Sequence, residues 1–439
     1  MCGILGVWSP LGFTQKTFIR WLRTLRHRGQ ETAGILWEGE RLSWWNPSHS
    51  MPIDNEDRIV KGGLGHARYS TSGVKDVGTE GNVQPLVAEV GGGIVALVHN
   101  GNVSALEPDP RKTDSVLLWE WILHHYKTSN SWPQTLTHLI STFHGAFSIV
   151  IQTPEGVYVV RDRHGVRPLW IAFDSTTGTH LVSSETCAFP DRWRDVPPRE
   201  VKPGDLLFTD LTIPWKRLWR FQTKVPKRFC SFEWIYFQHH TSSSVYGKRF
   251  ELGEALALDE DQVMDLANPD TLVACMPRTA IPMAAGFADA LGLTFVEEAI
   301  QKAPSCERTF IMASAKERTE AFKAKFVLDE NALRGKVVFL VDDSLVRGST
   351  MQAMLARLNG LGVAKIHVRI ASPPVANSCD KGIDIPTKEE LFWSKEDKSS
   401  IETQCASLRY LSVERMVGVV GRGSCTYCFT GVQAWADEF

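Results

Sequence analysis

A cysteine at the second position is the residue of this chain with the clearest chemical potential. Cys2 follows the initiator methionine in the opening MCGILGVW, and removal of that methionine, which is usual before a small residue, would leave a free α-amine. One residue would then carry a soft nucleophile and a base with a near-neutral pKa. This combination suits acyl transfer from an amide. A buried cysteine in an early strand is an equally good interpretation of Cys2 taken alone.

Several polar motifs follow in the first half of the chain. They are RHRGQETAGI (26–35), GHARYSTSG (65–73), VHNGNVS (98–104), TDS (113–115), GAFSIV (145–150) and RDRHGVRPL (161–169). In order and approximate spacing, these segments resemble the glutaminase domain of N-terminal-nucleophile amidotransferases. The resemblance favours the nucleophile interpretation: Cys2 attacks the side-chain amide of glutamine, forms a thioester and releases ammonia.

The turn Asn100–Gly101 is the candidate for stabilising the oxyanion of that reaction. It follows the apolar run IVALV, and a side-chain amide and a backbone N–H there would both point at the developing negative charge. An Asn-Gly turn is also typical of an ordinary hairpin. Both interpretations can hold, because a tight turn is one way to present a backbone N–H.

The charged ends of glutamine require a cation and an anion. Arg68 is the candidate for the α-carboxylate, because a guanidinium binds a carboxylate through two parallel hydrogen bonds. Asp114 is the candidate for the α-ammonium by resemblance, whereas its spacing alone favours the N-cap of the following helix. Arg28 matches a family position beside the nucleophile and completes the predicted glutamine-binding set. His66 and His99 are expected to be structural, since the amine of the nucleophile already supplies a base.

An apolar run that ends in two acids is the second chemical signal. KVVFLVDDSLVRGST (336–350) begins like a buried parallel strand and then enters a loop of small residues before a helix. Backbone N–H groups at such a helix start bind phosphate, and the acids bind ribose hydroxyls or Mg²⁺. A generic Rossmann-like strand end is the alternative. The full string resembles the phosphoribosylpyrophosphate (PRPP) signature of type I phosphoribosyltransferases, which assigns PRPP binding to Asp342, Asp343, Arg347, Gly348, Ser349 and Thr350.

Together, the two halves resemble the glutamine PRPP amidotransferases. Further matching segments are CSFEWIYF (230–237), SVYGKRFELGEALA (244–257), RTFI (308–311), SPP (372–374) and GIDIPTKEEL (382–391). The resemblance implies that ammonia from glutamine displaces pyrophosphate from PRPP and gives 5-phosphoribosylamine, the first step of purine biosynthesis. It also implies nucleotide feedback inhibitors and a homo-oligomer, either a dimer or a tetramer.

Two loops depart from the family pattern. The pyrophosphate loop, P-D-S-G in the family, reads Pro277–Ala280: Thr279 keeps a hydroxyl near the expected Mg²⁺, which Asp342 and Asp343 would also hold, whereas Arg278 replaces an acid. The loop that closes over PRPP, K-N-R-Y in the family, reads QKAPSCE (301–307), in which only Lys302 is equivalent. Two alternatives therefore stay open: a paralogue with another phosphorylated sugar or nucleotide as acceptor, or a non-catalytic nucleotide sensor. The retained nucleophile argues against the sensor.

The C-x-x-C pair near the end of the chain suggests a metal site. Taken alone, Cys425 and Cys428 fit zinc, a redox pair or neither. Resemblance to the iron–sulfur branch of the family adds Cys230 and Cys379 and implies a [4Fe–4S] cluster that acts as a structural staple. Tetrahedral zinc is the alternative. The remaining cysteines are expected to be small buried apolar residues; they are Cys187, Cys275, Cys306 and Cys405.

Two domains must position these residues. Residues 2–225 read as strands alternating with turns, VYVVRDR, HLVSSE and DLLFTD among them, and the resemblance implies an α+β glutaminase built as an αββα sandwich. Residues 226–439 are expected to form an α/β type I phosphoribosyltransferase domain that carries the cysteine pair. In this domain the helix after the acid pair should end at Gly360 and Gly362 before the strand KIHVRI.

Composition sets the compartment. The net charge of −2 gives no indication of nucleic-acid or membrane binding, and the sequence shows neither a secretory signal nor an apolar run long enough to span a bilayer. We therefore expect a cytoplasmic enzyme. Its nine cysteines should be reduced thiols or metal ligands, since disulfides are rare in that compartment.

Overall fold

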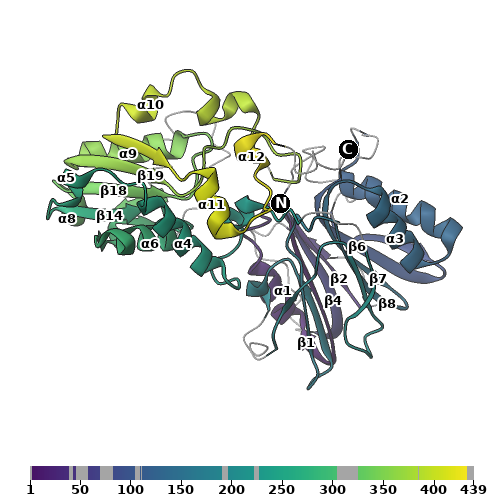
Figure 1. The fold of residues 1–439 in the computed structure, drawn as a ribbon. Coiled ribbons are helices and arrows are strands. Elements are labelled where there is room, and N and C mark those ends of the chain that lie inside the picture. The colour runs from purple at the N-terminus through teal and green to yellow at the C-terminus, as the bar shows by residue number, and fades with distance from the viewer. Residues whose placement is uncertain are drawn as a thin grey trace. The chain divides into compact units, whose positions relative to one another are not determined.

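A computed structural model describes residues 2–38, 43–45, 58–69, 83–103, 109, 111–189, 196–221, 227–303, 325–383 and 385–432. The chain divides into two compact units (Figure 1). The first contains Met1–Cys230, Thr241–Ser243 and Cys379–Asp384, and the second contains Ser231–His240, Ser244–Ser378 and Ile385–Phe439. Two short segments of the second half of the sequence are thus part of the first unit.

The first unit is built on two antiparallel sheets. The 7-stranded sheet has the order β11 (Arg199–Glu200), β9 (Trp170–Asp174), β10 (Thr179–Ser183), β1 (Gly3–Thr14), β4 (Ile59–Arg68), β2 (Thr32–Trp37), β3 (Ser43–Trp45). The 6-stranded sheet has the order β13 (Lys216–Arg220), β12 (Asp205–Thr209), β8 (Gly156–Arg161), β7 (Ala146–Thr153), β6 (Gly93–Asn102), β5 (Leu86–Val90). The predicted strand segments at residues 157–163, 180–185 and 205–210 correspond to β8, β10 and β12.

Helices cover the outer faces of both sheets (Figure 1). Helix α1 (Gln15–Arg23) packs on the first sheet, and α2 (Asp114–Ser129) and α3 (Trp132–Thr142) pack on the second. Strand β1 shows how period-2 alternation builds these layers. Leu5 and Val7 join the core under α1, whereas Ile4 and Trp8 lie in the core between the sheets. The predicted αββα sandwich is confirmed. A short helix, η2 (Thr186–Ala188), follows β10.

The second unit is built on a parallel sheet. Its 5 strands have the order β15 (Thr294–Phe295), β14 (Thr271–Cys275), β18 (Val337–Asp342), β19 (Lys365–Ile370), β20 (Ser407–Tyr410), and all four pairings are parallel. A separate hairpin joins β16 (Ile300–Lys302) to β17 (Phe326–Leu328). The α-helices described are α4 (Val245–Ala257), α5 (Val263–Leu266), α6 (Ile281–Leu291), α8 (Glu330–Leu333), α9 (Ser349–Leu361), α10 (Ser399–Glu402), α11 (Val413–Val420) and α12 (Tyr427–Thr430). The π-helix η4 (Glu233–Phe237) and the 3-10 helices η5 (Glu297–Ala299), η6 (Lys388–Glu390) and η7 (Phe392–Ser394) are shorter elements.

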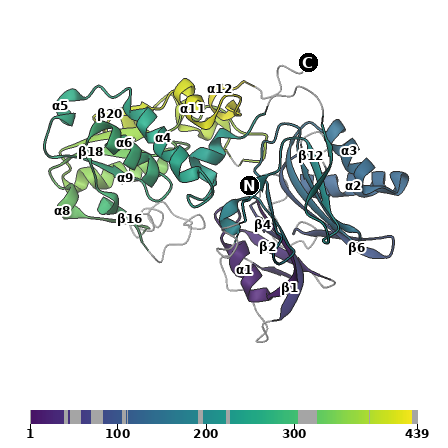
Figure 2. The ribbon, with the colours of Figure 1, turned by 60° about the horizontal axis from the view of Figure 1, so that its bottom comes forward.

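Helices pack on both faces of this sheet (Figures 1 and 2). On β18, Val338 and Leu340 join the core formed with α9, whereas Phe339 faces the other way and its ring lies 5.8 Å from that of Phe287 on α6. Helix α9 ends at Leu361, where Gly362 takes the left-handed conformation. The expectation that Gly360 also stops this helix is wrong, because Gly360 lies within it.

The strand order also predicts where this unit binds ligands. In chain order the strands lie 2-1-3-4-5, so the direction of winding reverses between β14 and β18. Open α/β sheets bind ligands outside the carboxyl ends of their strands at such a switch point. Those ends carry the pyrophosphate loop and the two acids. Among the described residues, no helix combines the length and the apolar character needed to cross a bilayer.

Candidate active sites

The start of the chain is held by residues far away in the sequence. Cys2 precedes β1, whose neighbour β4 pairs Ala67 with Gly3. The Cys2 backbone nitrogen donates to Asn100 Oδ1 at 3.1 Å, and the Cys2 thiol lies 3.8 Å from the carbonyl oxygen of Tyr69. The first sulfur is therefore placed beside the predicted oxyanion turn.

The predicted turn at Asn100–Gly101 is wrong: both residues lie in β6 and pair with Ser148 and Phe147 of β7. We keep the name oxyanion turn for this pair of residues, in which Asn100 carries a buried donor. Asn100 is completely buried, and its Nδ2 has no hydrogen-bond partner among the described residues. Because Cys2 already occupies Oδ1, the amide group is oriented with Nδ2 available for a substrate oxygen. Gly101 has a φ of +151°, and a Cβ there would lie 1.8 Å from the Ala146 carbonyl oxygen, so only glycine fits this close approach to β7.

A buried carboxylate fixes Arg28 beside the nucleophile. The Arg28 Nε donates to the carbonyl oxygen of Cys2 at 2.9 Å, and its Nη1 donates to Glu185 Oε1. Glu185 also binds His27 Nε2 at 2.8 Å and accepts from the Ser242 hydroxyl at 2.7 Å. Sequence reasoning missed Glu185. The only signal for it was that a buried arginine in RHRG needs an anionic partner.

Cys187 lies next to this group. With His27 and Glu185 it forms a set of side chains whose ligand atoms lie within 4.8 Å of one another. The guanidinium of Arg28 already occupies the shared carboxylate, so the set is an ion-pair cluster. Burial raises the pKa of the Cys187 thiol, with the Glu185 charge as a further cause, which keeps the sulfur protonated.

Arg68 and Asp114 reach the same region from two other elements. Arg68 is the last residue of β4 and is buried. Asp114 is not the N-cap of α2, as its spacing alone suggested: Thr113 is the N-cap and accepts from the Val116 nitrogen. The Asp114 carboxylate instead accepts from the Val103 nitrogen at 3.2 Å, just after the oxyanion turn.

The two histidines are buried within the scaffold. His66 Nε2 contacts the carbonyl oxygen of His99, and His99 Nδ1 contacts the hydroxyl of Ser115. Burial lowers the pKa of His66 to about 3 and also lowers the pKa of His99. Both imidazoles are therefore neutral at pH 7, in keeping with the structural role expected for them.

In the second unit, the two acids lie at the carboxyl end of β18. The backbone nitrogen of Asp343 donates to Asp342 Oδ1 at 2.9 Å, and the Ser344 hydroxyl donates to Asp343 Oδ1 at 2.6 Å. Burial raises the pKa of both carboxyls, and in Asp342 the neighbouring acid adds to the effect. A cation bound at this site would favour the ionised form of both carboxyls.

The rest of the predicted phosphate loop leads into a helix. Gly348 is the N-cap of α9 with a φ of +84°, and Ser349 and Thr350 begin the helix with exposed side chains. Arg347 is exposed, and its Nε lies 3.3 Å from Glu390. The backbone N–H groups of the first turn of α9 therefore follow directly after the acids.

The pyrophosphate loop has the same position on the neighbouring strand. Pro277–Ala280 links the end of β14 to α6, whose N-cap is Ala280. Arg278 is exposed and Thr279 is half-buried. Two helix N-termini, which attract anions, thus follow the two strands at the switch point. Of the expected lid, only Gln301–Ala303 lies within the described residues.

Arg249 is a further residue that sequence reasoning missed. It lies within the segment 244–257 but was assigned no role. Its side chain is buried on α4, and its charge acts to lower the raised pKa of Asp343. Arg249 Nε and Nη2 donate to the carbonyl oxygens of Trp234 and Gln238.

Backbone hydrogen bonds in the second unit connect the segments that carry the predicted cluster ligands. The nitrogen of Ser231 donates to the Cys425 carbonyl oxygen at 3.2 Å, and those of Ala376 and Asn377 donate to the Cys428 carbonyl oxygen at 2.9 and 3.0 Å. Ser231 directly follows Cys230. Of the other four cysteines, Cys275 is buried, Cys187 and Cys405 are half-buried, and Cys306 lies outside the described residues.

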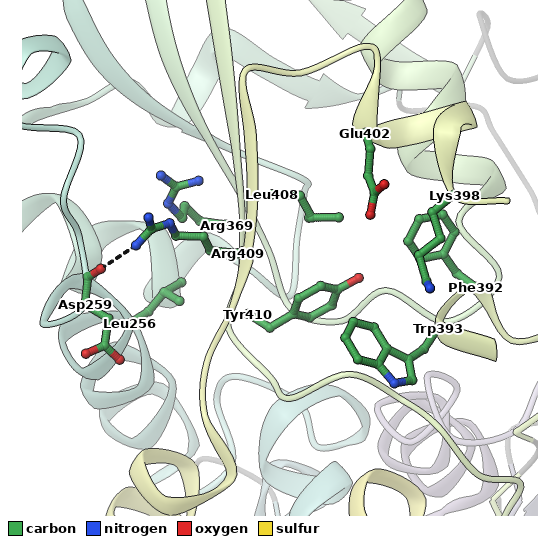
Figure 3. A pocket seen from close by; sticks show the side chains of 10 residues that line it. All are labelled: Leu256, Asp259, Arg369, Phe392, Trp393, Lys398, Glu402, Leu408, Arg409 and Tyr410. Carbon is green, nitrogen blue, oxygen red and sulfur yellow. Dashed lines mark hydrogen bonds between the residues drawn. The ribbon is translucent and has the colours of Figure 1, made fainter. Parts of the chain in front are cut away.

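A pocket of about 350 Å³ lies on the second unit (Figure 3). It is lined by Leu256, Asp259, Arg369, Phe392, Trp393, Lys398, Glu402, Leu408, Arg409 and Tyr410. None of the predicted site residues lines it. Its wall is nevertheless linked to the phosphate loop, because the Phe392 nitrogen donates to the Val346 carbonyl oxygen at 2.8 Å.

These features define a class of protein: a glutamine amidotransferase joined to a phosphoribosyltransferase. Family models of a glutamine amidotransferase domain and a phosphoribosyl transferase domain match residues 66–191 and 252–394. The amidophosphoribosyltransferases of Bacillus subtilis and Methanothermobacter thermautotrophicus are 32% and 33% identical to the chain, with alignments that cover 98% of it and 93% and 94% of those proteins. The chain therefore belongs to the amidophosphoribosyltransferase family.

Solved structures agree. One described as the allosteric regulatory enzyme of purine biosynthesis matches with a TM-score of 0.82 and 31% identity, covering 100% of this chain and 98% of that one. The B. subtilis glutamine PRPP amidotransferase complexed with ADP and GMP matches with a TM-score of 0.79 and 30% identity over 99% and 98%. The predicted family, fold class and activity, glutamine-dependent amidotransfer to PRPP, are confirmed. The two alternatives gain no support.

Proposed function

We propose that Cys2 and the residues around it hydrolyse glutamine, and that the acid pair and its loop bind the PRPP that receives the nitrogen. Ammonia from the first site attacks C1 of PRPP, the C1–oxygen bond to pyrophosphate breaks, and 5-phosphoribosylamine forms. This is the family's activity assigned to particular residues of this chain.

Cys2 is the nucleophile, with its own amine as the base. Once Met1 is removed, the nitrogen that now donates to Asn100 is the α-amine. It takes the thiol proton as sulfur attacks the amide carbon and returns it to the leaving nitrogen, which departs as ammonia. Water then hydrolyses the thioester to glutamate. Arg28 holds the carbonyl oxygen of Cys2, which fixes the sulfur.

The observation that carries this assignment is the orientation of Asn100. Its Oδ1 is occupied by the Cys2 nitrogen, and its buried Nδ2 points to no described partner. A buried amide donor without a hydrogen-bond partner costs free energy, and a ligand that accepts its hydrogen bond removes that cost. The tetrahedral oxygen formed on glutamine, with the Gly101 N–H as second donor, fits this requirement. Arg68 and Asp114 then bind the α-carboxylate and the α-ammonium.

The phosphate site fits a divalent cation. Asp342 and Asp343 supply hard oxygen ligands whose ionisation is suppressed by burial, and the Thr279 hydroxyl is the third proposed ligand. Mg²⁺ bound there would offset the charge of the pyrophosphate group. The first turn of α9, with Gly348, would bind the 5-phosphate through its backbone N–H groups.

We propose that Cys230, Cys379, Cys425 and Cys428 hold a [4Fe–4S] cluster, with zinc as the alternative, because four thiolates suit either group. Within the second unit, the Ser231 nitrogen donates to the Cys425 carbonyl oxygen, and the nitrogens of Ala376 and Asn377 donate to that of Cys428. The Lys381 nitrogen donates to Cys379 Sγ at 3.3 Å, and such N–H bonds stabilise a thiolate ligand. Iron and acid-labile sulfide analysis, with electron paramagnetic resonance after reduction, distinguishes the two. Stoichiometric zinc without iron would replace the cluster by the alternative.

Regulation and assembly are proposed on the same basis. The B. subtilis relative was crystallised with ADP and GMP, and we propose that purine nucleotides inhibit this chain and that it forms a homodimer or homotetramer. Inhibition curves with both nucleotides and light scattering coupled to size-exclusion chromatography test these two statements separately.

The decisive experiment measures glutamine turnover with and without PRPP and Mg²⁺, with the products identified by mass spectrometry. We expect PRPP and Mg²⁺ together to stimulate glutamate formation and to yield pyrophosphate in equal amount. A parallel screen replaces PRPP by ribose 5-phosphate or a nucleotide and tests the acceptor, since Arg278 departs from the family. Glutamate formation that PRPP leaves unchanged, with no pyrophosphate released, would overturn the proposal.

A further inference from the structure

A short segment from the second half of the sequence belongs to the glutaminase unit. Residues 379–384 join the first unit, although the chain before and after them belongs to the second. We propose that the part described here, Cys379–Ile383, which we call the strap, holds the oxyanion turn in its active geometry. This inference rests on the proposed roles of Cys2 and Asn100.

The backbone of the strap lies directly against the oxyanion turn. Gly382 has a φ of +88°, and a Cβ on it would lie 2.7 Å from the carbonyl carbon of Gly101 and 2.8 Å from its oxygen. Real Cβ contacts are never this close, so the strap and the Gly101 peptide group touch as tightly as two backbones can. Any displacement of the strap must therefore move the turn or open a gap behind it.

Two side chains bind the strap: Asn102 from the end of β6 and Arg167 from the loop between β8 and β9. Asn102 Nδ2 donates to the Asp380 carbonyl oxygen at 2.9 Å. Arg167 is completely buried, and its Nε and Nη2 both donate to the Lys381 carbonyl oxygen, the first at 3.0 Å. Displacement of the strap would break both of these bonds to a buried guanidinium, which is costly.

Arg167 also leads back to the turn through the neighbouring strand. The Ser148 hydroxyl donates to the Arg167 carbonyl oxygen at 3.2 Å, and Ser148 is the register partner of Asn100 on β7. The strap is thus linked to the turn by direct contact at Gly101, by Asn102 and by the path from Arg167 to Ser148. Because three separate connections link the strap to the oxyanion turn, we infer that the strap positions this turn.

The strap begins at a residue with a second task. Cys379, a proposed cluster ligand, accepts the Lys381 N–H, and the Lys381 ammonium binds Asp380 Oδ2 at 2.6 Å. Lys381 therefore accepts from Arg167 through its carbonyl oxygen and donates to Cys379 Sγ through its backbone nitrogen. Lys381 thus links Cys379 to Arg167, and the next residue, Gly382, contacts Gly101.

The test compares two glycine substitutions. Gly382→Ala adds a methyl group against the Gly101 peptide, whereas Gly92→Ala adds one at a similar φ of +78° with no atom within 4 Å, in the hairpin at the other end of β6. Both place alanine at a similar positive φ, so the difference between the two variants reports mainly the contact with Gly101. We expect Gly382→Ala to lower kcat for glutamine hydrolysis by about 10- to 100-fold relative to Gly92→Ala, because small misplacements of a catalytic donor are that costly.

Alkylation of Cys2 by iodoacetamide separates positioning from general damage. This displacement develops no oxyanion, so its rate at Cys2, followed by peptide mass spectrometry, should stay within about twofold in Gly382→Ala while kcat falls and KM changes little. Equal kcat in the two glycine variants, or a matching loss of alkylation and kcat in Gly382→Ala, would overturn the role of the strap.

A milder variant guards against misfolding. Asn102→Ala removes only the bond to Asp380 and should lower kcat by a few-fold, on the order of one neutral hydrogen bond; an unchanged kcat would contradict the proposal. Failure of the underlying function is recognised separately: the unmodified protein would then show no glutaminase that depends on Cys2.

Discussion

The two candidate sites balance their charges in opposite ways. In the glutaminase site, buried groups are paired within the protein: Arg28 binds Glu185 and the Cys2 carbonyl, and the Cys2 nitrogen binds Asn100. In the phosphate site, Asp342 and Asp343 are adjacent, the first half-buried and the second buried, and desolvation raises the pKa of both. The first site is arranged before its substrate arrives, whereas in the second two adjacent carboxyls lie where a bound cation would offset their negative charge.

The difference follows from the chemistry. Covalent attack on an amide gains from a fixed nucleophile and fixed oxyanion donors, since reorganisation at the moment of reaction is then avoided. Binding of a metal pyrophosphate gains from acids that favour a cation over solvent. The glutaminase site should therefore respond to substitution through kcat, and the phosphate site through ligand and proton binding.

The largest expected effect separates the two sites completely. Cys2→Ala should lower glutamine-dependent pyrophosphate release by at least about 10³-fold, because no other group can form the thioester. Pyrophosphate release with ammonium as the nitrogen source should stay within about twofold. Cys405→Ala, a half-buried cysteine of the second unit, is the control and should change neither rate. A parallel loss of both activities in Cys2→Ala would show that the sites are not independent.

The next effect tests the prearranged donor. Asn100→Ala removes the free Nδ2, and kcat for glutamine should fall by about 10²- to 10³-fold, the usual effect of one oxyanion donor. Steady-state kinetics should show KM changed much less than kcat, since the donor acts on the transition state. Asn100→Asp keeps the shape and an acceptor for the Cys2 nitrogen but places a negative charge at the oxyanion, so it should be at least as slow. An active Asp variant would contradict the assignment.

The same contrast decides how much the sequence could predict. The phosphate site is local: an apolar strand, two acids, a glycine cap and a helix follow one another within residues 336–361, so a single segment predicts the strand, the loop and the helix. The glutaminase site is assembled by antiparallel pairing from residues up to 180 positions apart, as in the bond from Ile4 to Ser184. Cys2 and Asn100 were found because a family resemblance supplied their order along the chain.

Residues whose importance comes only from their partners were missed. Glu185 ends an ordinary strand sequence, HLVSSE, and nothing local shows that it will meet Arg28. Gly382 and Arg167 each look like turn or surface residues until the strap is placed in the first unit. Local spacing also misassigned the N-cap of α2 to Asp114, because Thr113 competes for the same position. Long-range pairing of polar groups is the part that pattern alone does not contain.

A smaller effect tests the internal ion pair of the first site. Glu185→Gln keeps the shape but removes the charge opposite the buried Arg28, and should lower the free energy of unfolding by about 3 kcal/mol. Chemical denaturation measures this change. Glu200→Gln is the matched control: Glu200 also pairs with a buried arginine, Arg161, but its side chain is 46% exposed. That pair should contribute about 1 kcal/mol or less. Equal losses in the two variants would mean that burial of the carboxylate is not what matters.

The smallest effect tests the unbalanced charge of the second site and has the opposite sign. Folding raises the pKa of Asp342 above its unfolded value, so the folded state binds more protons, and stability falls as pH rises from the unfolded pKa through the raised one. Asp342→Asn removes that loss and should raise the thermal midpoint of the ligand-free protein near pH 7 by a few degrees, about 1 kcal/mol or more. Its Oδ1 can still accept the Asp343 N–H, so the loop geometry is kept.

The control variant is Asp289→Asn, at an exposed position on α6, which should change the free energy of unfolding by less than about 0.5 kcal/mol. When thermal unfolding is measured from about pH 4 to 8, the midpoint should therefore fall less steeply with rising pH in Asp342→Asn than in the unsubstituted protein. A lower midpoint for that variant would mean that a protein cation already balances the acid pair, and the two sites would then differ less than their geometry indicates.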